Sequence, residues 1–336
     1  MIGRVATALG AAAVSLVGLR AVGRRAADRL LDAPRVGPSE AGLADQLDAL
    51  GGEVIRFRSR DGLRLAGRWL RAEAGDPDWP PDPHEAILLL HGYSGSIAPD
   101  LVEYGPFLRR TANVLGIDFR GHGDSEAGPS TFGLLEVEDI AGALAWLGER
   151  GIRRVALIGT SMGAMAAITA VAILGDGSLT AADADADPTR ADVDAPRPSI
   201  VAVIADSAAP EVDLPVANRM RTPARRFVAA RAFDAAARRL GADPRETEPI
   251  RVIGLVEPVP LLLIHGEADT TVPVQDGRRL AAAGGPSTQH WTVPGADHSA
   301  SHTTVPQDYE RRVTDHLRMA FRTARDDHLR GEGRDL

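Results

Sequence analysis

Ser161 stands between two glycines in the sequence Gly159-Thr160-Ser161-Met162-Gly163, directly after the apolar run Val155–Ile158 and before a run of small, apolar residues. A serine on such a turn between a strand and a helix can attack a carbonyl carbon, and the glycines permit the sharp turn. The pattern G-x-S-x-G alone is weak evidence, since about 0.15 matches are expected by chance from the serine and glycine content. The interpretation therefore depends on the partners that this serine would need.

A serine hydroxyl is a poor nucleophile unless a general base takes its proton and an acid orients that base. Two candidate residues follow apolar runs that are typical of buried strands. Asp269 follows Leu261–Ile264 in the segment HGEADTTVP, and His298 follows His290–Val293 in the segment GADHS. The order serine, acid, histidine along the chain is the one used by folds that carry this turn.

Other residues compete for both roles. Asp206 also follows an apolar run, Ile200–Ala205, and is the alternative acid. His302 lies shortly after His298 and is an alternative base, whereas His290 begins an apolar run instead of following one. These alternatives stay open at the level of the sequence.

The composition excludes several other chemistries. All 38 residues counted as lysine or arginine are arginine, and cysteine is absent. Without lysine there is no Schiff base and no Walker-type phosphate loop, and without cysteine there is no thiol nucleophile, disulfide or zinc ribbon. The nucleophile must therefore carry oxygen or imidazole.

The net charge of −8, with no basic block, argues against nucleic acid as the main partner.

The elements that would position these residues alternate between strands and helices. From Glu53 onward, apolar and polar residues alternate in two runs that are joined around Asp61-Gly62. This pattern predicts an antiparallel hairpin. Runs typical of buried strands follow at Ala86–Leu90, Asn113–Asp118, Val155–Ile158, Ile200–Ala205, Leu261–Ile264 and His290–Val293. Helical patterns cover Leu134–Arg150, Met162–Leu174, Gln275–Ala283 and Asp308–Arg325. This alternation predicts an α/β fold whose mostly parallel sheet has eight strands, flanked by helices.

Two insertions interrupt the alternation. Gly175–Ser199 is acidic, low in complexity and rich in proline, so we expect a solvated loop. Its D-A-D-A-D run lacks the glycine and the terminal glutamate of a calcium-binding loop, so no metal site is predicted. Residues 208–258 carry an arginine- and alanine-rich helical pattern between two core strands, which makes them the candidate for a helical lid.

The beginning of the chain carries an apolar run, Val5–Leu19, flanked by arginines. The run is shorter than the ~20 residues that span a bilayer, and positive charge stands where a signal peptide would be cleaved. A membrane-associated helix is favoured, with the following domain cytoplasmic, while a plain helix or tail and a secretory signal stay open. We expect a separate segment over residues 1–30, a catalytic domain over residues 50–325 and a C-terminal tail over residues 326–336.

Together these motifs resemble the α/β-hydrolase superfamily over about Glu53 to Arg325. Besides the serine turn, the resemblance rests on His91-Gly92-Tyr93 after the strand AILLL, on DFRGHGDS at Asp118–Ser125, and on the HGEAD and GADHS segments. The R-G-H-G-x-S signature is most similar to that of bacterial serine esterases, lipases and aminopeptidase-like members.

The resemblance implies roles for individual residues. Ser161 would be the nucleophile, His298 the general base and Asp269 the orienting acid. The backbone N–H groups of Tyr93 and Met162 would form the oxyanion hole, which stabilises the negative charge on the reacting carbonyl oxygen.

The expected function is hydrolysis of a carboxylic ester through an acyl-enzyme, with a small ester or acyl substrate and no cofactor. A serine peptidase, a thioesterase and an acyltransferase of the same fold are the alternatives. A non-catalytic binding protein is less favoured, because none of the implied catalytic residues is missing.

Overall fold

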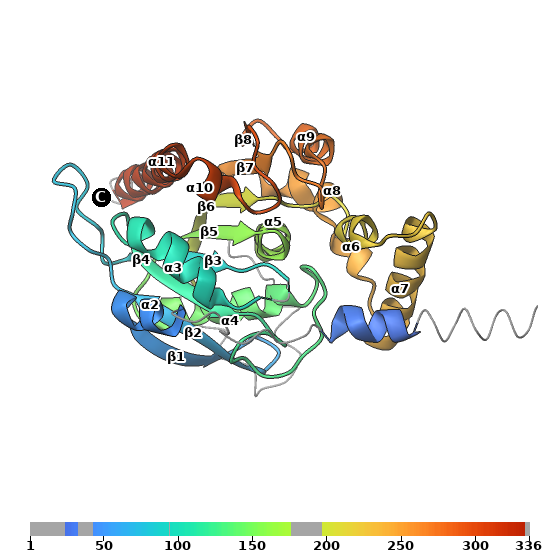
Figure 1. Cartoon of the computed structure of the whole chain (residues 1–336). Coiled ribbons are helices and arrows are strands. Elements are labelled where there is room, and N and C mark those ends of the chain that lie inside the picture. The colour runs from blue at the N-terminus through green and yellow to red at the C-terminus, as the bar shows by residue number, and fades with distance from the viewer. Residues whose placement is uncertain (1–23, 33–42, 94, 176–196, 333–336) are drawn as a thin grey trace, which may run out of the picture.

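The structure is a computed structural model that describes residues 24–32, 43–93, 95–175 and 197–332 of the 336-residue chain. Its centre is an eight-stranded sheet in the order β1-β2-β4-β3-β5-β6-β7-β8. Helices cover both faces of this sheet (Figure 1). The predicted α/β fold with a mostly parallel sheet is confirmed.

The first two strands, β1 (Glu53–Arg58) and β2 (Arg64–Leu70), form the predicted antiparallel hairpin at one edge of the sheet. Gly62 in the turn has a φ of 97°, a conformation that residues with a Cβ atom rarely adopt. β2 also pairs antiparallel with β4, and the remaining neighbours pair in parallel.

The other six strands follow the predicted apolar runs. They are β3 (Glu85–Leu90), β4 (Asn113–Asp118), β5 (Arg154–Thr160), β6 (Ser199–Asp206), β7 (Leu261–Gly266) and β8 (Thr288–Val293). In β3, Ala86, Leu88 and Leu90 pack into one apolar cluster, while Ile87 and Leu89 pack into a second. Successive side chains of a strand point to opposite faces, so β3 separates two cores.

The helices divide between these two cores. α4 (Glu136–Glu149), α5 (Met162–Leu174) and α9 (Val274–Ala283) contribute to the first cluster, and α3 (Ile97–Leu108) and α11 (Pro306–Glu332) to the second. A short helix, α2 (Leu43–Leu50), contacts α3. The sequence patterns predicted α4, α5, α9 and α11 but neither α2 nor α3.

The C-terminal helix α11 continues to Glu332. The boundary that the sequence placed at residue 325 therefore lies inside this helix. Arg325 itself binds Glu85 of β3, with Nε 2.8 Å from Oε1. This ion pair holds α11 against the sheet at Arg325, and the helix continues beyond it.

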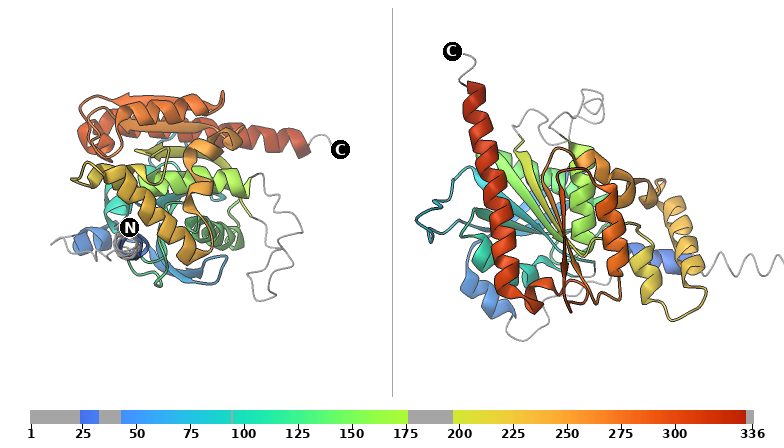
Figure 2. Two further views of the ribbon diagram at one scale, coloured as in Figure 1. Left: turned by 90° about the vertical axis from the view of Figure 1, so that its right-hand side faces the viewer. Right: turned by 90° about the horizontal axis from the view of Figure 1, so that it is seen from above.

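Residues 208–258, which we call the cap segment, lie between β6 and β7. They form α6 (Leu214–Arg219), α7 (Arg225–Leu240), η2 (Pro244–Thr247), α8 (Pro249–Val252) and η3 (Ile253–Val256). The ends of the segment belong to the main core, where Val212 and Ile253 are buried. The views in Figures 1 and 2 place α6 and α7 outside the sheet, beyond the carboxyl ends of its parallel strands.

A helix over residues 24–31 packs against α7 (Figure 1). Ala27 and Leu31 form a small apolar cluster with Ala235 and Ala236 of α7. The sequence interpretation set residues 1–30 apart from the folded domain, and for residues 24–30 that separation is wrong. Ala27 is buried against α7, and Leu30 belongs to the main core.

No helix among the described residues is long and apolar enough to cross a membrane. The apolar run Val5–Leu19 lies outside the described residues, as does most of the insertion at 175–199. The predictions made for these two segments stay predictions.

Candidate active site

Ser161 lies at the sharp turn between β5 and α5, as the sequence predicted. Its backbone has a φ of 50°, an uncommon value for a residue other than glycine. A Cβ atom on Gly159 would clash with the backbone of Gly163, and one on Gly163 would clash with the carbonyl oxygen of Leu90. The two glycines therefore let the helix approach the sheet, while the turn presents the serine at the strand end.

Ser161, His298 and Asp269 form one continuous chain of hydrogen bonds. Nε2 of His298 lies 2.9 Å from Oγ of Ser161, and Nδ1 lies 2.8 Å from Oδ2 of Asp269. The three residues come from the ends of β5, β7 and β8, which are brought together by the parallel sheet. The imidazole thus stands between a hydroxyl and a carboxylate, the arrangement that general-base activation of a serine requires.

The side chain of Asp269 is fixed from both sides. Its Oδ1 atom accepts the backbone N–H groups of Thr271 and Val272, at 2.8 and 2.7 Å. Its Oδ2 atom is left to face His298, with the ring of His265 3.5 Å away on the other side. Burial lowers the pKa of His265, so this second imidazole favours the neutral form. The TTVP segment after Asp269 therefore orients the carboxylate toward a single imidazole donor.

The alternative acid, Asp206, has a different set of partners. Its buried Oδ1 atom accepts hydrogen bonds from the hydroxyl groups of Ser207 and Ser301, at 2.9 and 3.0 Å. Its backbone oxygen accepts the N–H of Ser161 at 2.8 Å. Burial raises the pKa of Asp206 to about 6, although the two hydroxyls lower it. Asp206 thus lies beneath the site, and Asp269 is the carboxylate bonded to His298.

The loop after β3 lies directly against the serine. A Cβ atom added to Gly92 would be 3.5 Å from the Cβ of Ser161. His91 holds this loop: its Nε2 accepts the N–H of Phe119 at 3.1 Å, and its Nδ1 lies 2.7 Å from the oxygen of Gly92. Burial lowers the pKa of His91 to about 3, which favours the neutral ring that this pair of bonds requires. His91 thus ties the loop after β3 to the segment that follows β4.

Tyr93, next in this loop, is fixed through its side chain. Its hydroxyl donates to the carbonyl oxygens of Arg29 and Leu30, at 3.1 and 3.0 Å. Its ring stacks on Phe132 with the centroids 5.0 Å apart. The helix over residues 24–31 therefore supports the loop beside Ser161, a contact that the sequence interpretation missed because it left this helix out of the fold.

His302, the alternative base, is held elsewhere. Nδ1 lies 2.8 Å from Oε1 of Glu103 on α3, and Nε2 lies 3.3 Å from Oε1 of Glu310 on α11. Burial lowers the pKa of His302, but the two glutamates outweigh burial, so the pKa is raised. His302 therefore anchors α10 (Ser301–Thr304), which follows His298, and both of its ring nitrogens are engaged by glutamates.

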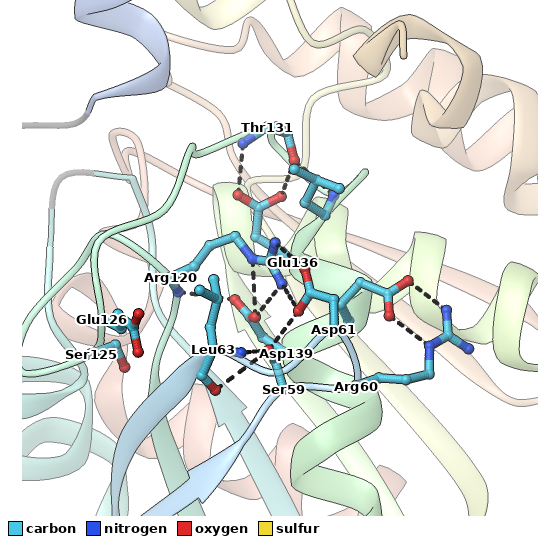
Figure 3. Close-up of polar contacts among 12 residues, drawn as sticks. Ser59, Arg60, Asp61, Leu63, Arg120, Ser125, Glu126, Thr131, Glu136 and Asp139 are labelled. Carbon is cyan, nitrogen blue, oxygen red and sulfur yellow. Dashed lines mark hydrogen bonds and ion pairs between the residues drawn. The ribbon is translucent and has the colours of Figure 1, made fainter. Parts of the chain in front are cut away.

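The signature after β4 forms a polar network (Figure 3). Arg120 is buried and bonds Asp139 through both its backbone N–H, at 2.9 Å, and its guanidinium, at 2.7 Å. The same guanidinium bonds Asp61 of the hairpin turn at 2.8 Å. Burial raises the pKa of Asp139 to about 7, although Arg120 lowers it. The arginine of the signature thus joins the hairpin to α4, and its contacts are structural.

No group of three histidine, aspartate or glutamate side chains in the part of the chain that the structure describes could hold a metal ion. The D-A-D-A-D run lies outside the described residues, so the prediction made for it stays a prediction.

Comparison with other sequences assigns a family. The model of the alpha/beta hydrolase family matches residues 87–312. The uncharacterized protein YfhR of Salmonella typhimurium is 28% identical over 252 residues, which cover 73% of this chain and 74% of that protein. The uncharacterized protein YqkD of Bacillus subtilis is 26% identical over 242 residues, which cover 71% of this chain and 72% of that protein.

Solved structures share the fold. The esterase Pf2001 of Pyrococcus furiosus gives a TM-score of 0.61 at 21% sequence identity, covering 86% of this chain and 99% of that one. The alpha/beta hydrolase GrgF of a Penicillium species gives 0.56 at 17% identity, covering 81% of this chain and 99% of that one. Since the family model spans most of the chain, and the eight-stranded sheet carries the serine turn at its centre, the protein belongs to the alpha/beta hydrolase family.

Proposed function

We propose that the protein is a serine hydrolase that cleaves carboxylic esters through a covalent acyl-enzyme. The observation that carries this proposal is the unbroken chain from Asp269 through His298 to Ser161, with hydrogen bonds of 2.8 and 2.9 Å. Three residues far apart in the sequence meet in the geometry that activates a hydroxyl group. A non-catalytic role would leave this arrangement without a purpose.

The proposed reaction has two halves. Oγ of Ser161 attacks the ester carbonyl while Nε2 of His298 takes its proton, and the same proton then passes to the departing alcohol. Water repeats the sequence on the acyl-enzyme, which releases the acid and restores the serine. Asp269 holds the Nδ1–H of His298 throughout and stabilises the imidazolium that forms. No step needs a cofactor.

The developing oxyanion would be bound by two backbone N–H groups. Met162 begins α5, so its N–H has no acceptor within the helix, and the helix dipole points its positive end at the site. The N–H of Tyr93 would be the second donor, since Gly92 beside it packs on Ser161. Losing one such donor costs about 3–4 kcal/mol of transition-state stabilisation.

Three acidic residues of the cap segment, Glu211, Asp213 and Asp234, are poorly suited to bind a peptide with a free amino terminus, which favours an ester. Such a peptide needs an available carboxylate to bind its ammonium group. Glu211 already binds Arg279 at 2.6 Å, and Asp234 binds Arg245 at 2.9 Å and Arg231 at 3.1 Å. Asp213 is partly buried, and burial raises its pKa, which disfavours the charged form. The similarly folded Pf2001 of Pyrococcus furiosus is named an esterase, which also supports an ester substrate for the proposal.

The proposal also covers the cap segment and the beginning of the chain. The cap segment would be the lid that shapes the substrate pocket. A thioesterase or an acyltransferase would use the same residues and differ in the acceptor of the acyl group. Residues 5–19 would associate with a membrane and keep the catalytic domain on its cytoplasmic side.

A labelling experiment tests the proposal. We expect a fluorophosphonate probe to label the wild-type chain and to leave Ser161→Ala unlabelled, with p-nitrophenyl ester hydrolysis reduced by ~10³-fold or more. Ser199→Ala is the matched control, since this exposed serine begins β6 at the opposite end of the sheet and the variant keeps the nucleophile. Labelling of the Ser161→Ala variant would refute the assignment, and cleavage of aminoacyl p-nitroanilides in preference to esters would favour the peptidase.

A further inference from the structure

The surface formed by residues 24–32 and 214–241 carries a concentration of positive charge. These two stretches contain ten arginines and three aspartates, and all ten arginines are exposed. The whole chain has a net charge of −8, so the remainder is strongly acidic. We call these two stretches the basic face.

Most of this charge is not neutralised by neighbouring carboxylates. Within the described residues, Arg231 pairs with Asp234, and Arg239 pairs with Asp28 and Asp32. No carboxylate lies within ion-pair distance of the other eight arginines in the part of the chain that the structure describes. An anionic partner would therefore find guanidinium groups that need not break an existing pair.

The basic face is one surface made of elements far apart in sequence. The helix over residues 24–31 lies beside α7 in both Figure 1 and Figure 2. Leu31 packs on Ala235, and Arg239 of α7 reaches Asp28 with its Nη1 at 2.9 Å. The two helices are thereby joined, and each of them carries exposed arginines.

An aromatic side chain stands among these arginines. Phe227 on α7 is 55% exposed, and the guanidinium of Arg231 lies 5.5 Å from its ring centroid. Arg231 and Arg238 follow at helical spacing, with Asp234, the ion-pair partner of Arg231, between them. A surface of this kind suits a bilayer, because the ring can enter the headgroup region while the arginines bind lipid phosphates.

The basic face also adjoins the site. Tyr93, beside Ser161, bonds the backbone of Arg29 and Leu30 in this face. In the sequence, residues 24–32 come directly after the apolar run Val5–Leu19 and its flanking arginines. A membrane bound at this face would therefore lie at the end of the sheet where the nucleophile is presented.

We propose that the basic face, residues 24–32 and 214–241, is a docking surface for a bilayer that contains anionic phospholipids. The partner is a membrane surface and not a nucleic acid, since the exposed phenylalanine and the adjacent apolar run offer nothing to a phosphate backbone alone. This inference does not depend on the reaction at Ser161. It differs from anchoring by residues 5–19 because it assigns binding to the folded domain.

Vesicle sedimentation with the full chain tests the proposal. Wild type is expected to bind vesicles of equal parts phosphatidylglycerol and phosphatidylcholine, and to bind pure phosphatidylcholine vesicles at least tenfold more weakly. The variant Arg225→Gln/Arg226→Gln/Arg238→Gln should lose roughly fivefold in anionic-vesicle affinity per arginine, or about a hundredfold in total. High salt should weaken wild-type binding in the same direction.

The variant Arg71→Gln/Arg110→Gln/Arg278→Gln is a charge-matched control, because it replaces three exposed arginines that lie outside the basic face. This variant should bind like wild type, and circular dichroism with both variants verifies that a loss of binding does not come from unfolding. Unchanged vesicle binding by the basic-face variant would overturn the proposal and assign binding to residues 1–23. Retention on heparin that needs the basic face, without vesicle binding, would also overturn it in favour of a soluble polyanion.

Discussion

The buried carboxylate of Asp206 accepts a hydrogen bond from the hydroxyl of Ser301, with Oγ 3.0 Å from Oδ1. The same carboxylate oxygen binds Ser207, whose Oγ accepts the N–H of Ser299 at 3.0 Å. Ser299 and Ser301 both follow His298 in the chain. Asp206 therefore supports the loop that carries the histidine, while Asp269 contacts the imidazole itself.

This difference predicts unequal effects for two conservative substitutions. Asp269→Asn should lower kcat for p-nitrophenyl butyrate by about 10³- to 10⁴-fold, because an amide can donate to Nδ1 and fix the wrong tautomer of His298. Asp206→Asn keeps an oxygen that accepts from Ser301, and should lower kcat less than about tenfold. Steady-state rates with both variants, after their folding is verified by circular dichroism, measure the ranking. The opposite ranking would assign the orienting acid to β6.

A second prediction concerns the backbone of the serine turn. In Gly163→Ala the new methyl group would clash with the carbonyl oxygen of Leu90, which belongs to the central strand and cannot move aside. The free energy of unfolding should fall by ~2–3 kcal/mol in urea titrations. Gly254→Ala is the matched control, since its nearest contact would be Ala283 O at 3.8 Å, an ordinary distance. Equal stability of the two variants would show that the turn tolerates a Cβ atom.

A third prediction tests the link between the N-terminal helix and the site. Tyr93→Phe removes the hydroxyl that donates to Arg29 and Leu30. The variant should lose about 1 kcal/mol of stability, and amides of residues 24–32 should exchange faster with deuterium. Tyr309→Phe is the control, because this tyrosine of α11 contacts the rings of Tyr104 and Trp291, away from residues 24–32. Unchanged exchange in Tyr93→Phe would mean that the contacts with α7, Ser130 and the main core are enough to hold the helix.

The sequence predicted the sheet and the site residues for the same physical reason. Strands buried on both faces must be continuously apolar, so β3 and β5 are visible as runs, and polar residues directly after such runs must lie at one sheet edge. Ser161, Asp269 and His298 could be nominated in this way before any distance was known. Asp206 satisfied the same rule equally well, and only the side-chain geometry separated it from Asp269.

The missed elements depend on information that is not local. α3 contains Pro106 within its length, and a proline weakens any helical pattern read from the sequence. The helix over residues 24–31 is short, and its buried residues pack against α7 and the main core, which are far away along the chain. His302 finds Glu103 across a separation of 199 residues. The packing of residues 24–31 and the bond between His302 and Glu103 both join distant parts of the chain, so neither leaves a periodic pattern in the local sequence.

The pH dependence of stability provides a further test of the His302 anchor. Because Glu103 and Glu310 raise the pKa of His302 above its value in the unfolded chain, the folded state binds the proton more tightly. Its contribution is then fully present below about pH 6.5 and is lost as the pH rises through the raised folded value. His302→Gln should therefore lower the free energy of unfolding by an amount on the order of 1 kcal/mol at pH 6, and by less at pH 9.

Urea unfolding at both pH values measures the difference. His84→Gln is the control, since that ring bonds a backbone carbonyl, Gly151 O, at 2.8 Å. A loss that is the same at both pH values would show that His302 acts through packing on Phe107 and Tyr104 and not through its charge.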